Sequence, residues 1–185
     1  QELADKLVGI GFEVEEIIYT GDGIDKVVAG KILDIKPHTD ADKLSVCMVD
    51  SGKEILTIVT GAKNIRIGDI VPVALNGATL PDGKKIVSSP LRGVMSHGMF
   101  CSGKELGVDE STVDGAGVNG ILILDPSVSA GQDIRDVLGL NEYIFDISLT
   151  ANRPDCQSVY GMAREIGALL SRKVKTPSLK YKTVK

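Results

Sequence analysis

Several features that mark particular classes of protein are absent from this 185-residue sequence. Tryptophan is missing, aromatic residues make up only 4% of the chain, and no apolar run approaches the length of about 18 residues that a membrane span requires. No basic and apolar leader opens the chain. We therefore expect a cytoplasmic protein without membrane contact, and the 43% hydrophobic and 25% charged residues are those of an ordinary globular fold.

Cysteine and histidine are too sparse for a metal centre or a disulfide framework. Cys47, Cys101 and Cys156 are far apart and form no Cys-x-x-Cys pair, which predicts buried thiols in a reducing compartment. The only histidines are His38 and His97, so the usual ligands of a metal site are lacking. His38 follows a proline in a turn, where we expect a hydrogen-bonded loop histidine.

Catalytic motifs are missing as well. No spacing suggests a Ser-His-Asp or Cys-His set, no Gly-x-x-x-x-Gly-Lys-Ser phosphate loop occurs, and no Gly-x-Gly-x-x-Gly follows a strand. Asp40 and Asp42 stand beside Lys43 at the entrance of an expected strand, which favours a solvated turn over a catalytic pair. We predict no catalytic residue, no metal site and no cofactor site in this chain.

Short strands separated by turns dominate the middle of the chain. We expect strands at residues 12–19, 27–35, 44–49, 55–60, 70–75, 84–87, 121–124 and 143–149, and short helices at residues 102–106 and 133–138. The glycine-broken stretch at residues 91–102 fits a strand edge that bends across the mouth of a barrel. About five strands in some 80 residues favour an OB-type barrel, with an SH3-like barrel as the competing architecture.

Apolar residues at helical spacing mark the two ends of the chain. Leu3, Leu7 and Ile10 fit the end of one helix, and Pro154 stands at the first position of another that we expect from about Cys156 to Leu170. Each apolar stripe needs a partner, so we expect these helices to pack together. The domain at residues 25–137 is then inserted into a discontinuous domain of residues 1–24 and 138–185.

Positive charge is unevenly distributed along the chain. Residues 27–107 carry ten Lys/Arg and eight Asp/Glu, a net charge of +2 within a chain of net charge −4, and six basic residues follow from Arg172 onward. The barrel cations that could share one face are Lys31, Lys36, Lys43, Lys63, Arg66, Lys84, Lys85, Arg92 and Lys104. Phe100 is the lone aromatic residue there, which favours a structured nucleic acid over a stacked single strand. From the residues alone, nucleic acid and a protein partner both remain open.

A series of motifs resembles the tRNA-binding OB domain that several synthetases and free-standing tRNA-binding proteins share. The motifs are Val28-Ala29-Gly30-Lys31, Pro37-His38-Thr39-Asp40-Ala41-Asp42-Lys43-Leu44, Ile58-Val59-Thr60-Gly61-Ala62-Lys63-Asn64, Leu91-Arg92-Gly93-Val94-Met95-Ser96-His97-Gly98-Met99 and Glu105-Leu106-Gly107. The flanks, Phe12-Glu13-Val14-Glu15-Glu16 and Asp146 to Cys156, are similar to those of β subunits of bacterial phenylalanine-tRNA ligase.

The resemblance implies an α+β fold, with a five-stranded OB-type β-barrel inserted into a small helical, winged-helix-like domain formed by both chain ends. It implies a fragment of an α2β2 ligase that uses ATP and Mg²⁺, pairs with an α subunit, and keeps its synthetic site outside this chain. The residues that the resemblance places on the tRNA-facing surface are Lys43, Arg92, Ser96, Met99 and Ser102. A structural or assembly role with little tRNA contact is the alternative, and a free-standing tRNA chaperone is a third interpretation.

Overall fold

The computed structural model describes residues 1–178, which form two compact units. We call Tyr19–Glu142 the sheet unit, and Gln1–Ile18 together with Tyr143–Lys185 the end unit. No helix within residues 1–178 is both long and apolar enough to traverse a bilayer.

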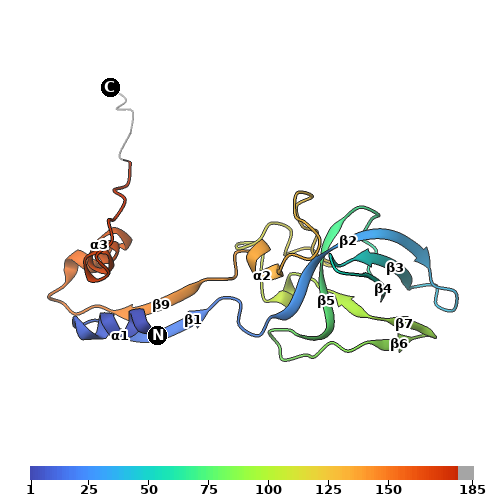
Figure 1. Ribbon diagram of the computed structural model, residues 1–185, viewed down its shortest axis with the longest axis horizontal. Coiled ribbons are helices and arrows are strands. Elements are labelled where there is room, and N and C mark those ends of the chain that lie inside the picture. Colours follow the sequence, from blue (N-terminus) through green and yellow to red (C-terminus); the bar gives the residue numbers. More distant parts are fainter. Residues whose placement is uncertain (179–185) are drawn as a thin grey trace, which may run out of the picture. The chain divides into compact units, whose positions relative to one another are not determined.

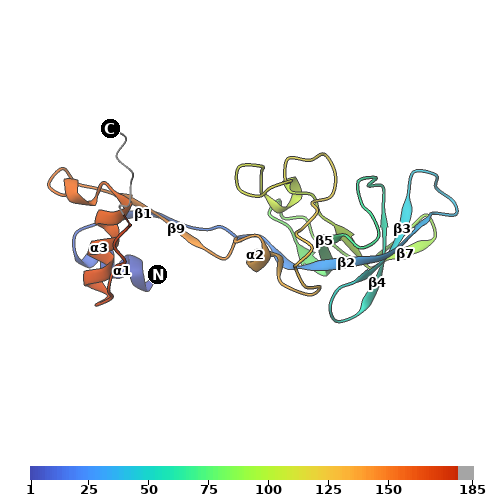
Figure 2. The ribbon, with the colours of Figure 1, turned by 90° about the horizontal axis from the view of Figure 1, so that it is seen from above.

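The sheet unit is built on a curled five-stranded antiparallel sheet with the strand order β4-β3-β2-β5-β8 (Figures 1 and 2). Its strands are β2 (Asp25–Pro37), β3 (Ser45–Asp50), β4 (Ile55–Thr60), β5 (Ile70–Thr79) and β8 (Gly98–Phe100). A separate hairpin joins β6 (Ser89–Leu91) to β7 (Val94–Ser96). The prediction of a five-stranded β-fold is confirmed at the level of this sheet.

Strand β2 explains how the sheet curls. Its first half pairs with β5 and its second half with β3, and the register shifts near Val27 and between Ile32 and Asp34. Such irregularities bend a strand and increase its twist. At the crossing point a side chain on Gly30 would lie 2.5 Å from Val73 Cγ2, so glycine is required there.

The two edges of the curled sheet meet through hydrogen bonds. The His97 N–H donates to the Thr57 carbonyl at 2.9 Å, and the Val59 N–H donates to Ser96 Oγ at 3.0 Å. Strand β4 is therefore tied to the segment that connects β7 to β8. This contact holds the β6–β7 hairpin against the sheet.

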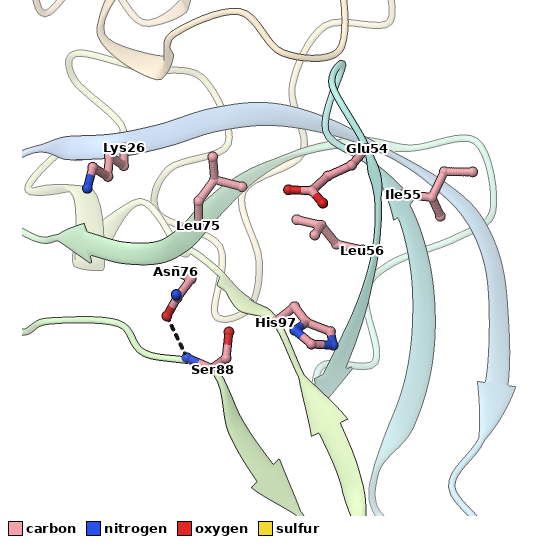
Figure 3. Close-up of a pocket in the computed structure, with 8 residues that line it drawn as sticks. All are labelled: Lys26, Glu54, Ile55, Leu56, Leu75, Asn76, Ser88 and His97. Atoms are coloured by element: carbon pink, nitrogen blue, oxygen red, sulfur yellow. Dashed lines mark hydrogen bonds between the residues drawn. The ribbon is translucent and has the colours of Figure 1, made fainter.

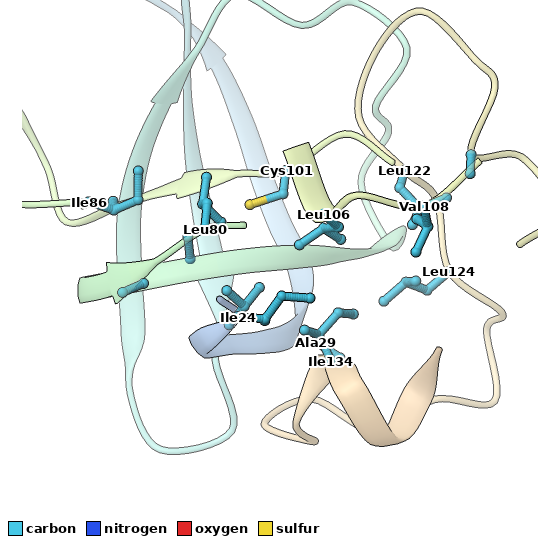
Figure 4. Packing of buried hydrophobic residues seen from close by; sticks show 14 of the residues in the cluster. Ile24, Ala29, Leu80, Ile86, Cys101, Leu106, Val108, Leu122, Leu124 and Ile134 are labelled. Atoms are coloured by element: carbon cyan, nitrogen blue, oxygen red, sulfur yellow. The ribbon is translucent and has the colours of Figure 1, made fainter. Parts of the chain in front are cut away.

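The core of the sheet unit consists of two clusters of buried side chains. One cluster lies between β5 and the segments that follow β8, and includes Leu80, Cys101, Leu106, Leu122 and Ile134 (Figure 4). The other lies inside the curl and includes Ile32, Cys47, Ile58, Val73 and Phe100. Alternation of buried and exposed positions along β3 and β4 delivers these side chains to the inner face.

Two predicted strands are wrong. Residues 84–87 and 121–124 form only the isolated bridges Thr79↔Lys85 and Ile70↔Leu124. The Leu122 N–H donates to the Cys101 carbonyl at 3.2 Å, while the Leu124 N–H donates to the Ile70 carbonyl at 2.8 Å. Because the segment bonds to two different neighbours, no continuous ladder forms, although Leu122 and Leu124 are buried as expected.

The two short helices of the sheet unit agree with the predictions. Helix η1 (Lys104–Leu106) is a single 3₁₀ turn, and α2 (Ile134–Val137) begins after Asp133, whose side chain accepts the Arg135 N–H. Asp133 is an N-cap of the type that sequence patterns identify. The Arg135 side chain also donates to Asp133, and this bond holds the pKa of the Asp133 carboxyl below its usual range.

The end unit contains α1 (Glu2–Gly9), β1 (Glu13–Tyr19), β9 (Tyr143–Ser148), η2 (Pro154–Cys156) and α3 (Val159–Leu169). Strands β1 and β9 form a two-stranded sheet. Leu7, Phe12 and Cys156 are its buried apolar cluster, with Leu3, Ile166 and Leu169 packed around them. The predicted packing of the two terminal helices is therefore confirmed.

The predicted start of the second helix is wrong. Pro154 begins the 3₁₀ turn η2, and α3 begins only after Ser158, whose Oγ accepts the Gly161 N–H at 3.0 Å. Ser158 has extended backbone angles, so it separates the two elements. The apolar stripe continues across this break, which is why sequence periodicity joins the two elements.

Candidate nucleic-acid interface

Arg92 lies at the tip of the β6–β7 hairpin. Leu91 and Val94 are paired, so Arg92 and Gly93 alone form the turn, and both have positive φ angles, 50° and 88°. Positive φ at both central residues is the signature of a type I′ turn, which suits the twist of a two-residue hairpin. The guanidinium is consequently presented to solvent at the end of a short, tightly closed hairpin.

The backbone of Arg92 is costly for an arginine. A left-handed conformation costs a residue with a Cβ atom about 1 to 2 kcal/mol, and asparagine or glycine is the usual choice at this turn position. No side chain among residues 1–178 forms an ion pair with Arg92 that would offset this cost. Strain of this kind points to a role outside folding.

Lys43 lies on a loop that reaches the same hairpin. The loop spans residues 38–44 between β2 and β3 and is closed by the His38 N–H, which donates to the Leu44 carbonyl at 3.1 Å. The His38 ring bonds to the Leu91 carbonyl, next to Arg92, at 3.1 Å. The structure therefore brings the loop of Lys43 against the hairpin of Arg92, and confirms His38 as a hydrogen-bonded loop histidine.

Ser96 is buried and its hydroxyl is fully used inside the protein. The side chain is 3% exposed, and its Oγ accepts the Val59 N–H and donates to the Gly98 carbonyl, each at 3.0 Å. The neighbouring His97 is exposed because successive residues of an extended chain point to opposite sides. In this position Ser96 holds the hairpin to β4 rather than facing a ligand.

Ser102 is half-buried and caps the turn of η1. Its N–H and its Oγ–H both donate to Glu105 Oε2, at 2.8 and 2.9 Å, and its Oγ accepts the Glu105 N–H at 3.3 Å. This reciprocal Ser-x-x-Glu arrangement is a capping box, so the local sequence accounts for the geometry.

Lys84 is a neighbour of Met99 and Glu105 that sequence patterns did not single out from the other barrel cations. Its ammonium lies 3.5 Å from the Met99 sulfur and 4.0 Å from Glu105 Oε1. Because Glu105 is bonded to Ser102, these four side chains form one connected group. Their closeness depends on residues 84–87 lying beside the end of β5, which no local pattern shows.

A cavity of about 270 Å³ is lined by some of the residues that were predicted to face tRNA. Its lining includes Lys84, Lys85, Ser89, Ser96 and Met99. Of the five predicted site residues, Ser96 and Met99 line this cavity. Ser102 is connected to the cavity through Glu105 and Lys84. Lys43 and Arg92 lie outside the lining, on the loop and on the hairpin. We use the term cationic rim for the exposed cations Lys43, Lys84, Lys85 and Arg92, of which Lys84 and Lys85 line the cavity.

A second cavity of about 500 Å³ lies on another side of β4 and contains none of the predicted residues. Figure 3 shows the side chains of Glu54 and Leu56 facing Asn76 and Ser88 across it, with the Ser88 N–H bonded to Asn76 Oδ1 at 2.9 Å. His97 also lines this cavity. Its mixture of Lys26, Glu54 and apolar side chains gives it no single charge.

Asn64, the last residue of the third motif, has a structural role. Its amide donates to the Ile121 carbonyl at 2.8 Å and accepts the Ile121 N–H at 3.1 Å. The acidic loop at residues 108–120 is ordered by Glu110, whose carboxylate accepts hydrogen bonds from the N–H groups of Gly115 and Gly117. These bonds lower the pKa of the Glu110 carboxyl. The asparagine therefore fixes this loop to the sheet.

The end unit holds one cluster of potential metal ligands among residues 1–178. One ligand atom each from Asp155, Cys156 and Glu165 lies within 4.8 Å of the others. The guanidinium of Arg153 already lies 3.1 Å from Asp155 and 2.9 Å from Glu165, and it lowers the pKa of Asp155 to about 2. Burial raises the pKa of the Cys156 thiol, which disfavours the thiolate that a metal ion needs, so this cluster suits the Arg153 guanidinium and not a metal ion.

Comparison with known proteins agrees with this geometry. Residues 27–133 match the family model described as "Putative tRNA binding domain", and this range contains every side chain of the cationic rim. The chain belongs to this family. The matched residues begin in β2 and end before α2, so they cover most of the sheet unit.

The whole chain is also similar to phenylalanine-tRNA ligase β subunits. It is 50% identical to the β subunit of Clostridium acetobutylicum over 186 aligned residues, covering 100% of this chain and 23% of that protein. It is 51% identical to that of Clostridium tetani, covering 97% of this chain and 22% of the relative. The chain thus spans somewhat less than a quarter of the length of these relatives.

Among solved structures, a MetRS-related protein from Pyrococcus horikoshii is 22% identical, with a TM-score of 0.39. The alignment covers 57% of this chain and 85% of that protein. A likeness of this size is too slight to carry a conclusion.

Proposed function

We propose that this chain is the non-catalytic tRNA-binding portion of a phenylalanine-tRNA ligase β subunit. The match of residues 27–133 to the tRNA-binding family carries the proposal, and the similarity to β subunits along the whole chain specifies the enzyme. The cationic rim supplies a suitable surface, because phosphate contacts position a nucleic acid without a deep pocket. The partner is a folded tRNA, since the rim has no exposed aromatic platform for single strands.

The five predicted residues divide into two roles. Lys43 and Arg92 are exposed cations without ion-pair partners among residues 1–178, so they contact phosphates directly. Met99 offers a half-buried, adaptable apolar surface beside Lys84, which we add to the contact group. Ser96 and Ser102 use their hydroxyls within the protein and act by positioning the hairpin and the η1 turn.

We propose further that residues 25–137 form an OB-type barrel inserted into a winged-helix-like domain of residues 1–24 and 138–185. The strand order, the bent β2 strand and the bonds between β4 and residues 96–97 support the barrel. The pairing of α1 with α3 supports the discontinuous domain.

The activity of the whole enzyme is carried by other parts of an α2β2 tetramer in the cytoplasm, which includes an α subunit. That enzyme uses ATP and Mg²⁺ to attach phenylalanine to its tRNA. Within residues 1–178 the one cluster of potential metal ligands is occupied by Arg153 and includes a thiol, whereas Mg²⁺ prefers oxygen ligands and water. We therefore assign ATP and Mg²⁺ to sites outside this chain.

Salt-dependent binding of phenylalanine tRNA tests the proposal. We expect the 185-residue chain to bind at low salt and to weaken steeply as salt rises, because phosphate contacts release counterions. Arg92→Glu should weaken binding about tenfold or more, since a repulsive charge replaces a contact. Arg164→Glu makes the same charge reversal on the exposed surface of α3, and serves as the matched control that should bind nearly as well as the wild type.

A second substitution separates the charge of Arg92 from its backbone. Arg92→Asn removes the guanidinium but favours the left-handed turn, so it should raise the free energy of unfolding by up to about 1 kcal/mol while lowering tRNA affinity. Urea unfolding and tRNA titration measure the two effects on the same sample. An Arg92→Asn variant that binds tRNA like the wild type would contradict the role of the guanidinium.

The alternative is an assembly domain with little tRNA contact. One observation favours it: Phe100, the lone aromatic residue between residues 27 and 107, is only 3% exposed and offers no stacking surface. Absence of tRNA binding at every salt concentration, with the fold intact, would select this alternative.

A further inference from the structure

His38 is a buried histidine located between the two segments that carry the proposed phosphate contacts. Its side chain is 5% exposed. Nδ1 accepts the Asp40 N–H at 3.1 Å, within its own loop, and Nε2 lies 3.1 Å from the Leu91 carbonyl at the end of β6. One ring therefore bonds to the loop of Lys43 on one side and to the hairpin of Arg92 on the other.

The two hydrogen-bond partners of His38 select one tautomer of its ring. A backbone N–H can only donate, so Nδ1 must present a lone pair to Asp40; a carbonyl can only accept, so Nε2 must carry the hydrogen toward Leu91. Only the neutral Nε2–H tautomer satisfies both bonds at once. The ring is thus a polarised bridge with one donor end and one acceptor end.

No second hydrogen bond joins these segments. Among residues 1–178, the bond from His38 to Leu91 is the one hydrogen bond between residues 38–44 and residues 89–96. The loop is otherwise closed on itself, by the bonds of His38 and Ala41 to Leu44, and the hairpin is otherwise tied to β4 through Ser96. In the described part of the chain this imidazole is consequently the one direct hydrogen-bonded link between the loop of Lys43 and the hairpin of Arg92.

We infer that His38 is a positioning residue that holds the loop of Lys43 against the hairpin of Arg92, so that both cations contact phosphates of one folded tRNA. This inference rests on the proposed function. A spacing that is preset before binding lowers the ordering entropy that association costs, so its loss reduces affinity without removing either contact. His38 itself touches no tRNA, because its side chain is buried and both of its nitrogen atoms are occupied.

Two matched substitutions separate the two ends of the bridge. The amide nitrogen of glutamine reaches the position of Nε2 and can donate to Leu91, so His38→Gln keeps the link between the segments. The amide oxygen of asparagine reaches only the position of Nδ1, so His38→Asn keeps the bond to Asp40 and loses the link. Both variants place a neutral amide at the same buried site, which makes each a control for the stability of the other.

Titration with phenylalanine tRNA at low salt is the functional test. We expect His38→Asn to weaken binding about tenfold and His38→Gln to remain within about threefold of the wild type. Urea unfolding should show similar stabilities for both variants, so that the difference in affinity is not a difference in folding. Equal affinities for the Asn and Gln variants would overturn the inference.

A distance measurement tests the bridge without tRNA. Spin labels on Lys43→Cys and Met95→Cys, both at exposed positions, report the separation of loop and hairpin by pulsed electron resonance. We expect narrow distance distributions in the wild-type and His38→Gln backgrounds and a broad one with His38→Asn. An unchanged distribution in His38→Asn overturns the bridge, whereas a wild-type chain that does not bind tRNA overturns the proposed function and leaves the distances to judge His38.

Discussion

The sheet unit and the end unit reach stability in different ways. The sheet unit buries two apolar clusters, one of fifteen residues and one of nine. The described part of the end unit has one apolar cluster of three buried residues, Leu7, Phe12 and Cys156, and leaves Val159 91% exposed. A unit that buries so little apolar surface has a small hydrophobic contribution to its stability.

Polar contacts have a larger share in the end unit. Arg153 lies 5.1 Å from the centre of the Phe12 ring and forms ion pairs with Asp155 and Glu165. One arginine thus connects η2, α3 and Phe12, the residue that precedes β1. In the sheet unit the comparable arginine, Arg135, reinforces the Asp133 cap of α2 and also interacts with Tyr19. The large core of the sheet unit already determines its fold, and the cap of α2 adds support. In the end unit the core is small, so the contacts of Arg153 are needed to hold its elements together.

The largest expected difference comes from matched deletions in the two cores. Leu7 and Leu80 are both fully buried, and replacing either with alanine should cost about 3 to 5 kcal/mol. Leu7→Ala should unfold the end unit at 25 °C, while Leu80→Ala should leave the sheet unit folded with a lower melting temperature. Amide NMR spectra resolve the two units separately. Loss of the sheet unit in Leu80→Ala with survival of the end unit in Leu7→Ala would reverse the comparison.

The cysteines provide an intermediate test, because each of the three apolar clusters contains one. Burial raises the pKa of Cys47 to about 11 and that of Cys101 to about 12, so the folded state holds little reactive thiolate. Labelling then requires local opening, and Cys156 should react about tenfold faster or more. Mass spectrometry after digestion measures each rate, with equal rates in denaturant as the control. Faster labelling of Cys101 would show that the sheet unit opens first.

Acid should have the smallest of these effects. The bond from Arg153 lowers the pKa of Asp155 from its ordinary 3.8 to about 2. A lowered pKa stabilises the folded state above the ordinary value, and this stabilisation is lost as the pH falls from about 4 to about 2. Asp155→Asn should therefore flatten the pH dependence of end-unit stability in that window.

The matched substitution in the other unit is Asp133→Asn, because the pKa of Asp133 is also lowered by a neighbouring arginine. Asp133→Asn should change the pH dependence of the stability of the sheet unit and leave that of the end unit unchanged. Amide signals followed during acid titration distinguish the two responses. If the stability of the end unit depends on pH in the same way with and without the Asp155 carboxyl, the ion pair of Arg153 with Asp155 does not stabilise that unit.

Much of the fold could be predicted because its signals are local. The strands β3, β4 and β9 follow from runs of β-forming residues bounded by turns, and α2 follows from Asp133 before it and Gly139 after it. Residues 121–124 have the same local pattern but form no strand, because their backbone partners lie in two different segments. Residues 84–87 bond to the single segment at residues 77–80, but form only an isolated bridge with it. Strand formation requires a neighbour, and the neighbour is not encoded locally.

The same division applies to the candidate interface. The motif residues by themselves singled out Arg92, Lys43 and the resemblance to a tRNA-binding family that the match over residues 27–133 bears out. They placed Arg92 on a strand edge, whereas the structure places it at the tip of the β6–β7 hairpin. Only the tertiary structure decided that Ser96 faces inward and is bonded to Val59, that Lys84 lies against Met99, and that His38 connects the loop to the hairpin. The sequence by itself determines which chemical groups are present and how far apart they lie along the chain. A contact such as that between residues 38 and 91 forms only when the intervening residues fold around a packed core and bring the two segments together.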